Sequence, residues 1–190
     1  MTLILTAGPA EEPVTLAEAR AFLRLDDTGE DTLVTALITA ARATLEAETR
    51  CAFVTQNWRL MLDCFPEEAI LLPLAPVSAV TTISLLARTE PDEVLSETLF
   101  DFDLGSEPPR IWRASGAAWP TAKRRVAGIV IDFTAGYGGM GSVPQPLKQA
   151  VLMLVAHWYE ARLPVALDST ASEVPLTVAA LIAPYRRFRL

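Results

Sequence analysis

The sequence has 190 residues, 51% of them hydrophobic, and a formal net charge of -7 at pH 7. This length suits one domain, or a helical core with a second module, and the acidic balance argues against a general nucleic-acid binder, which needs a basic surface. No apolar run approaches the roughly 20 residues of a membrane-spanning helix, and the opening MTLILTAGPAEEPVT lacks the positive charge of a signal peptide. We therefore expect a soluble protein, made in the cytoplasm, that begins with a short arm.

Helical spacing marks two segments near the start of the chain. Thr15 and Glu18 predict a capping box before a short helix, and Thr28 with Asp31 offers a second box before a longer one. The apolar stripe of the second helix ends near Arg50. A tight acidic turn between the two helices predicts a helical hairpin.

Two more helices are expected after residue 143. Pro144 and Pro146 precede a third helix that is apolar on most of its surface, so both of its sides must be covered, by the same chain or by a neighbouring subunit. Residues 164–175 read as a loop, and residues 176–182 as a last short helix that Pro184 ends.

Between the helical segments the period of the sequence changes to that of strands. Apolar and polar residues alternate from Gln56 onward, and turn residues separate the candidates. The predicted strands cover residues 56–62, 70–72, 80–86, 99–104, 110–112 and 126–133. The fold class is therefore α+β, with a helical core of residues 14–53 and 143–190 and an inserted, mainly antiparallel β module of residues 54–142.

One stretch imitates a phosphate-binding loop. Residues 136–141 read GYGGMG, a literal GxGxxG between a predicted strand and a predicted helix. Pro144 and Pro146 remove amide donors where the helix begins, no second parallel strand follows, and Ser142 stands where a Walker A loop has lysine. We interpret the stretch as a glycine-rich turn and keep a nucleotide- or dinucleotide-binding enzyme as the alternative.

Few other residues suggest a catalytic or metal-binding role. His157 is the only histidine and is expected in the core or in an interface, and Cys51 and Cys64 are expected as buried apolar side chains, with a disulfide between them as a minor alternative. Asp101 and Asp103 fall on one face of a predicted strand, without further ligand types nearby. The sequence therefore predicts no metal, no cofactor and no catalytic residues.

The hydropathy, the third helix and the C-terminal residues give more information, because they indicate how the protein contacts other molecules. The mean hydropathy of +0.30 indicates more apolar surface than one small fold hides, so we expect self-association. The third helix is the expected subunit interface, through Leu152, Met153, Trp158 and Tyr159. The last six residues combine arginines with aromatics, the types that dominate interface hot spots, and predict a docking peptide: Tyr185, Arg186, Arg187, Phe188, Arg189 and Leu190.

Taken together, several segments resemble the head-tail connector, or adaptor, proteins of long-tailed phages and of phage-derived gene transfer agents. The resemblance runs nearly end to end, through VTLAEAR (14–20), LRLDD (23–27), TQNWR (55–59), LPLAP (72–76), WP (119–120), TAGYG (134–138), VP (143–144), AHWYE (156–160) and LIAPYR (181–186).

The resemblance implies a structural protein of the particle's head-tail junction. It implies a ring of about twelve copies beneath the portal protein, joined to the next neck protein, with DNA passing through the channel unread. The terminal peptide would then contact the portal. Another neck protein, such as a stopper or tail-completion protein, stays open as a further alternative.

Overall fold

The computed structural model describes residues 1–89, 91–161 and 174–187. The chain folds into two compact units, each assembled from two separate stretches of sequence. The helical unit contains residues Glu11–Val54 and Gly138–Leu190, and the β unit contains Met1–Ala10 and Thr55–Tyr137. The chain therefore passes between the units three times, once next to the glycine-rich turn.

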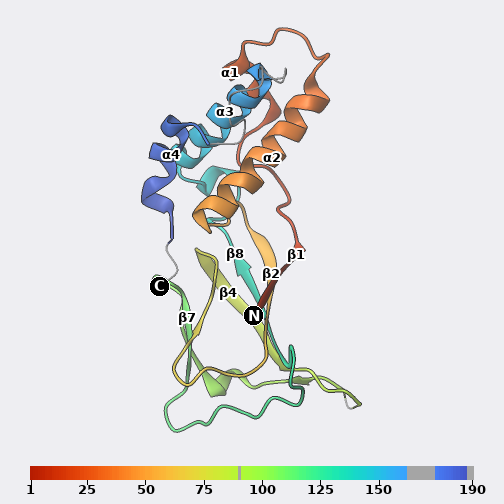
Figure 1. The fold of residues 1–190 in the computed structure, drawn as a ribbon, viewed down its shortest axis with the longest axis vertical. Coiled ribbons are helices and arrows are strands. Elements are labelled where there is room, and N and C mark those ends of the chain that lie inside the picture. The colour runs from red at the N-terminus through yellow and green to blue at the C-terminus, as the bar shows by residue number, and fades with distance from the viewer. Residues whose placement is uncertain (90, 162–173, 188–190) are drawn as a thin grey trace, which may run out of the picture. The chain divides into compact units, whose positions relative to one another are not determined.

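The helical unit is built around its third helix. Its helices are α1 (Leu16–Leu23), α2 (Asp31–Thr49), α3 (Gln145–Glu160) and α4 (Leu176–Ile182), and α3 packs against the other three (Figure 1). The fully buried face of α3 repeats at helical spacing and meets an apolar stripe on α2. The core side chains of these two helices are Val34, Ile38, Ala41, Leu45, Leu147, Ala150, Val151, Leu154 and Val155.

Only the first of the two expected capping boxes forms. The Thr15 hydroxyl accepts the Glu18 N–H at 3.1 Å, and the Glu18 carboxylate accepts the Thr15 N–H at 2.6 Å. These hydrogen bonds from Thr15, its backbone N–H first, lower the pKa of Glu18. The second box was wrong: the N-cap of α2 is Glu30, which makes no side-chain cap, and Thr28 offers only its carbonyl to the Asp31 N–H.

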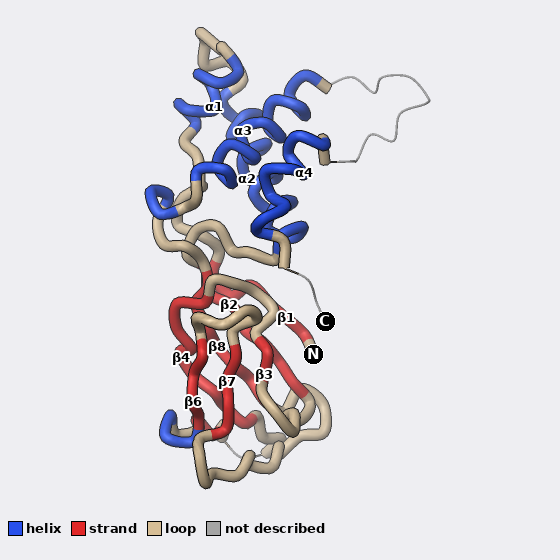
Figure 2. The backbone as a smooth tube through the Cα atoms, turned by 90° about the vertical axis from the view of Figure 1, so that its left-hand side faces the viewer, coloured by secondary structure: helices blue, strands red, loops and turns tan. Residues whose placement is uncertain are grey.

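The β unit contains two antiparallel sheets. The five-stranded sheet has the order β1-β2-β8-β4-β5, and the smaller sheet has the order β3-β7-β6 (Figure 2). The strands are β1 (Thr2–Ala7), β2 (Gln56–Leu62), β3 (Ile70–Leu71), β4 (Val77–Leu85), β5 (Glu93–Val94), β6 (Phe100–Asp103), β7 (Arg110–Arg113) and β8 (Ile129–Ala135). The mixed α+β class predicted from the sequence is thus confirmed.

Strand register gives the larger sheet one apolar face and one polar face. Leu60 pairs with Ile131, which pairs with Ile83, and all three side chains are buried. One residue further along, Arg59 pairs with Asp132 and forms two hydrogen bonds to its carboxylate, at 2.7 and 2.9 Å. The alternation that predicted strand 56–62 therefore sorts core residues from surface residues.

The structure differs from the sequence interpretation at the edges of the β unit. Residues 2–7, expected as an arm, form β1 and pair with β2, so the β unit includes the first ten residues. Residues 138–142, expected in the β module, group with the helices. Strand β5 was not predicted, since its two residues carry no period that a sequence can show.

Candidate assembly surfaces

The expected interface residues of α3 are half-buried in the isolated chain. Leu152, Met153, Trp158 and Tyr159 are neither core residues nor fully exposed ones. The face opposite them is closed: Leu154 is 1% exposed and Leu147 is 0% exposed. Leu152, Met153 and Ala156 therefore form an apolar strip along a helix whose other side is already packed, and we call these three residues the α3 strip.

Two polar residues lie near the α3 strip. His157, expected in the core or in an interface, is exposed in this chain. The Tyr159 hydroxyl hydrogen-bonds to the Glu30 carboxylate at the start of α2. Tyr159 thus ties α3 to α2, and because its side chain is only half-buried, part of the ring stays accessible to other molecules.

The described part of the C-terminal peptide lies against the end of α2. Arg187 donates its backbone N–H to the Thr49 carbonyl at 3.1 Å, and Arg186 forms an ion pair with Glu48. The buried Cys51 thiol donates to the Tyr185 carbonyl at 3.3 Å. Phe188, Arg189 and Leu190 lie outside the described residues. The sequence interpretation did not foresee that residues 185–187 are held by their own chain.

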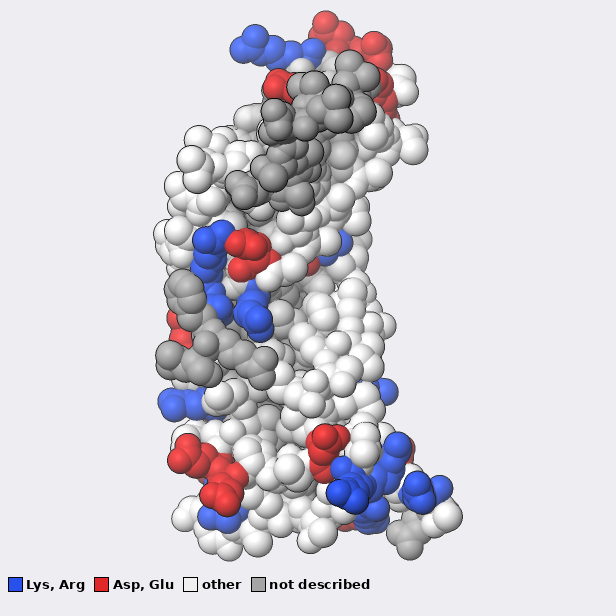
Figure 3. Space-filling view, viewed as in Figure 1, with Lys and Arg blue, Asp and Glu red and all other residues white. Residues whose placement is uncertain are grey.

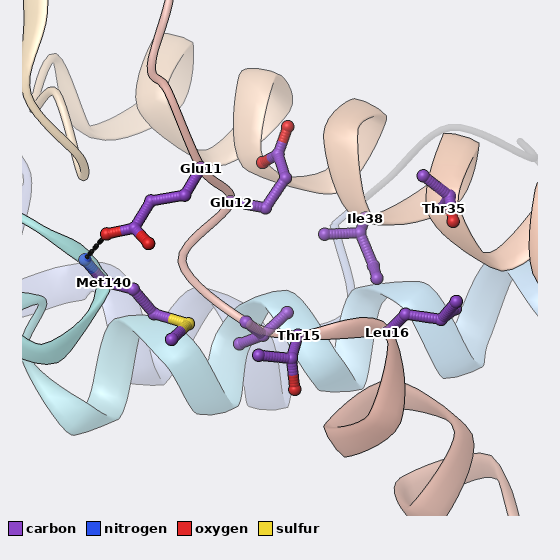
Figure 4. Close-up of a pocket in the computed structure, with 8 residues that line it drawn as sticks. Glu11, Glu12, Thr15, Leu16, Thr35, Ile38 and Met140 are labelled. Carbon is purple, nitrogen blue, oxygen red and sulfur yellow. Dashed lines mark hydrogen bonds between the residues drawn. The ribbon is translucent and has the colours of Figure 1, made fainter.

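A pocket of about 240 Å³ opens between α2 and the segment that leads into α1 (Figure 4). Two carboxylates lie on it, and each has a structural partner. Glu11 accepts the Met140 N–H at 2.6 Å, and Glu12 accepts from Arg42 Nε at 2.7 Å. Since both carboxylates are occupied by intramolecular bonds, the pocket offers no acid or base poised for catalysis.

The glycine-rich stretch forms a turn in which the Glu11 carboxylate already accepts the Met140 N–H. Gly136 and Gly138 adopt positive φ angles of 132° and 124°, which favour glycine. A Cβ at Gly139 would lie 3.0 Å from the Glu11 carboxylate, so glycine also permits the approach of that side chain. Glu11 thus occupies the Met140 N–H of this turn, and the sequence interpretation of a structural turn fits this geometry.

The remaining candidates for chemistry are also structural. Cys64, expected to be buried, is exposed, whereas Cys51 is buried; both are free thiols. Asp103 pairs with Arg110 at 2.8 Å. Within residues 1–89, 91–161 and 174–187, no three His, Cys, Asp or Glu side chains gather as a metal site, and no helix is long and apolar enough to cross a membrane.

Two surface features were not predicted from the sequence. Large apolar side chains are exposed, among them Leu176 (89%), Val94 (66%), Leu71 (52%), Leu5 (45%) and Ile4 (43%). Basic side chains gather over the loops of the β unit (Figure 3), where Lys123, Arg124 and Arg125 precede β8 and Arg88 follows β4. The 2.8 Å hydrogen bond from Leu86 N to the Gly128 carbonyl brings these two loops together.

These surfaces favour assembly over catalysis, and comparison with known proteins agrees. The model of the family described as "HCP: Head completion protein" matches residues 12–188, which is nearly the whole chain. The chain belongs to the head completion protein family. No curated protein matches it. Membership in this family, together with the solved structures described next, indicates a structural protein without enzymatic activity.

Three solved structures of similar chains come from gene transfer agent particles. A chain in the "Neck of empty GTA particle computed with C6 symmetry" is 32% identical, with a TM-score of 0.82. A chain in the "Virion of native gene transfer agent (GTA) particle" is 29% identical with a TM-score of 0.82, and one in the "Neck of native GTA particle computed with C12 symmetry" is 29% identical with a TM-score of 0.80. Each match covers 100% of this chain and 97% of the other. The predicted place of this head completion protein, the neck at the head-tail junction, is thereby confirmed.

Proposed function

We propose that this chain is an adaptor subunit that closes into a ring on the portal and joins it to the next neck protein, around a channel through which DNA passes. The observation that carries the proposal is the end-to-end likeness to chains in particle necks that were computed with sixfold and twelvefold symmetry. The acidic net charge supports a channel wall that does not hold the phosphate backbone.

A closed ring requires two different surfaces on each copy, one fitting the other. The α3 strip, with Trp158 and Tyr159 beside it, supplies apolar area for one of them, because these side chains are only half-buried in the isolated chain. In this arrangement the helical unit packs around the ring, and the loops of the β unit face the adjoining neck protein.

The assembly itself is testable by mass measurement and negative-stain imaging of the purified chain, alone and mixed with the portal protein of the same particle. We expect ring-shaped complexes in the mixture, with the copy number read from the mass, and about twelve copies is the expected value. A chain that stays monomeric even in the presence of the portal would contradict the proposal.

The C-terminal peptide is the proposed portal contact. Because residues 185–187 bond to Cys51 and to the end of α2, deleting all six residues would disturb the helical unit as well. Deleting only residues 188–190 avoids this, and we expect portal affinity to fall at least about tenfold, which corresponds to about 1.4 kcal/mol, since arginine and aromatic side chains dominate such contacts.

Binding of the truncated chain to immobilised portal measures this effect. Arg24→Ala is the matched control, because it removes one arginine from an exposed turn of the same unit and should leave affinity unchanged. If the chain without residues 188–190 binds the portal as well as the full chain, the peptide is not the contact.

A further inference from the structure

The first strand of the β unit has an open backbone edge. β1 lies at the margin of the five-stranded sheet and, among the residues that the structure describes, pairs only with β2, in antiparallel register from Thr2 to Ala7. All of its residues except Leu3 are exposed, and Ile4 and Leu5 retain 43% and 45% of their surface. Both the edge and the side chains of β1 are therefore available to another strand.

β1 lacks two of the usual protections of an edge strand, charged side chains and proline. Natural sheets guard their edges with charged residues, prolines or bulges. Residues 1–8 contain no charged side chain and no proline, and the pairing with β2 is regular until a shift between Leu5 and Ala7. An edge without charged side chains or proline tends to pair with further strands unless a partner covers it.

The opposite margin of the same sheet, formed by β4 and β5, is only partly paired. β5 pairs with β4 only at Ser84 and Leu85, which leaves residues 77–82 of β4 with β8 as their single strand partner in the described chain. Two bulges, at the register shifts near Ser78 and Thr81, twist this margin and discourage flat, unselective pairing. A groove of about 50 Å³ runs beside it, lined mainly by Val80, Ile83, Val94, Phe100 and Phe102.

Strand directions decide how the two margins can meet. β1 is antiparallel to β2, β2 to β8, and β8 to β4, so β1 and β4 run in opposite directions at opposite margins of one sheet (Figure 2). A rotation about an axis along the strands preserves these directions. It therefore brings β1 of one copy alongside β4 of the next in antiparallel orientation, with the apolar faces on the same side.

We propose that β1 of each subunit docks along residues 77–82 of β4 in the next subunit, with Leu5, whose partner Trp58 lies on the apolar face of the sheet, entering the groove. This inference rests on the proposed ring. A second copy is the occupant that fits, because residues 1–10 carry no charged side chain and the groove carries one carboxylate, Glu97, among mostly apolar side chains. The two margins are different surfaces of one chain, which is what a closed ring requires.

Disulfide trapping tests the pairing on the assembled full chain. Leu5→Cys combined with Thr81→Cys, or with Ser78→Cys to allow for register, is made in a Cys64→Ser background, since Cys51 is buried. On the portal-bound ring, oxidation should give a ladder of covalent multimers in non-reducing gels. Each single-cysteine variant should stay monomeric; dimers from Leu5→Cys alone would show that β1 pairs with β1 and would overturn the proposal.

A charge pair gives a second readout. Leu5→Lys should reduce ring yield at least about tenfold by placing an ammonium against the groove, and Leu5→Lys with Thr81→Glu should recover it. Leu71→Lys is the matched control, because it charges an exposed leucine of the other sheet and should leave ring yield unchanged. Rings that form in every variant and never cross-link would overturn this docking mode while leaving the proposed ring intact. Absence of rings from the unsubstituted chain would overturn both.

Discussion

Replacement of Arg42 by alanine is expected to lower the free energy of unfolding by about 3–5 kcal/mol, because it leaves two partly buried carboxylates without their cation. Arg42 is 8% exposed in the middle of α2. Its guanidinium binds Glu12 at 2.7 Å and Glu46 at 2.7 Å. Glu46 in turn accepts the Phe53 N–H at 2.7 Å, so one side chain ties together three segments of the helical unit.

The pKa of Arg42 reflects the same balance. Burial by itself lowers this pKa, but the hydrogen bonds and the charges of Glu12 and Glu46 outweigh it, and the pKa is raised above its ordinary value. Arg42 thus stays charged at every pH at which the protein folds. The carboxylates have a compensating charge only while this side chain is present.

Denaturant unfolding of the full chain, followed by circular dichroism, measures the loss. The matched control is Arg59→Ala, which removes an arginine with equally short contacts to Asp132 but with its side chain 44% exposed. An exposed pair contributes at most about 1 kcal/mol, so this variant should unfold almost like the parent. If Arg42→Ala lowers the free energy of unfolding no more than Arg59→Ala does, burial does not make the cluster of Arg42, Glu12 and Glu46 important for stability.

Leu152→Asp should abolish most ring formation while leaving the monomer folded. In the isolated chain this position is half-buried, so the carboxylate can still reach water. In a ring that covers the α3 strip, the same carboxylate would be buried without a partner, which costs far more than the lost apolar contact. We expect at least a tenfold loss of portal-bound rings in negative-stain counts, with thermal unfolding of the monomer nearly unchanged.

Leu154→Asp is the contrasting variant on the same helix. Leu154 is 1% exposed and faces the core, so a carboxylate there should unfold the helical unit instead of acting on assembly alone. The pair separates a surface effect from a folding effect. Full retention of rings by Leu152→Asp would remove α3 from the subunit interface.

The local sequence was enough to locate most elements. Capping by Thr15 and Glu18, the apolar stripe of α2 and the alternation in β2 depend on residues within a few positions of one another. Hydrogen bonds four residues apart in a helix, and side chains two residues apart in a strand, leave periodic traces. The short helix of residues 176–182 was located for the same reason.

The sequence could not determine the contacts between residues that are far apart along the chain. Arg42 and Glu12 are 30 positions apart, and Glu11 and Met140 are 129 positions apart; no local pattern records either pair. The same limit explains why β1 was taken for an arm, since six apolar and hydroxyl residues become a strand only when β2 offers its edge. Exposure of Cys64 and His157 likewise depends on which elements pack nearby. The composition and the periodicity of the sequence thus determined the fold class and its elements. Tertiary packing alone decided which strand edges, charged side chains and apolar strips remain exposed to other molecules, because the burial of a residue depends on how the elements are arranged in space.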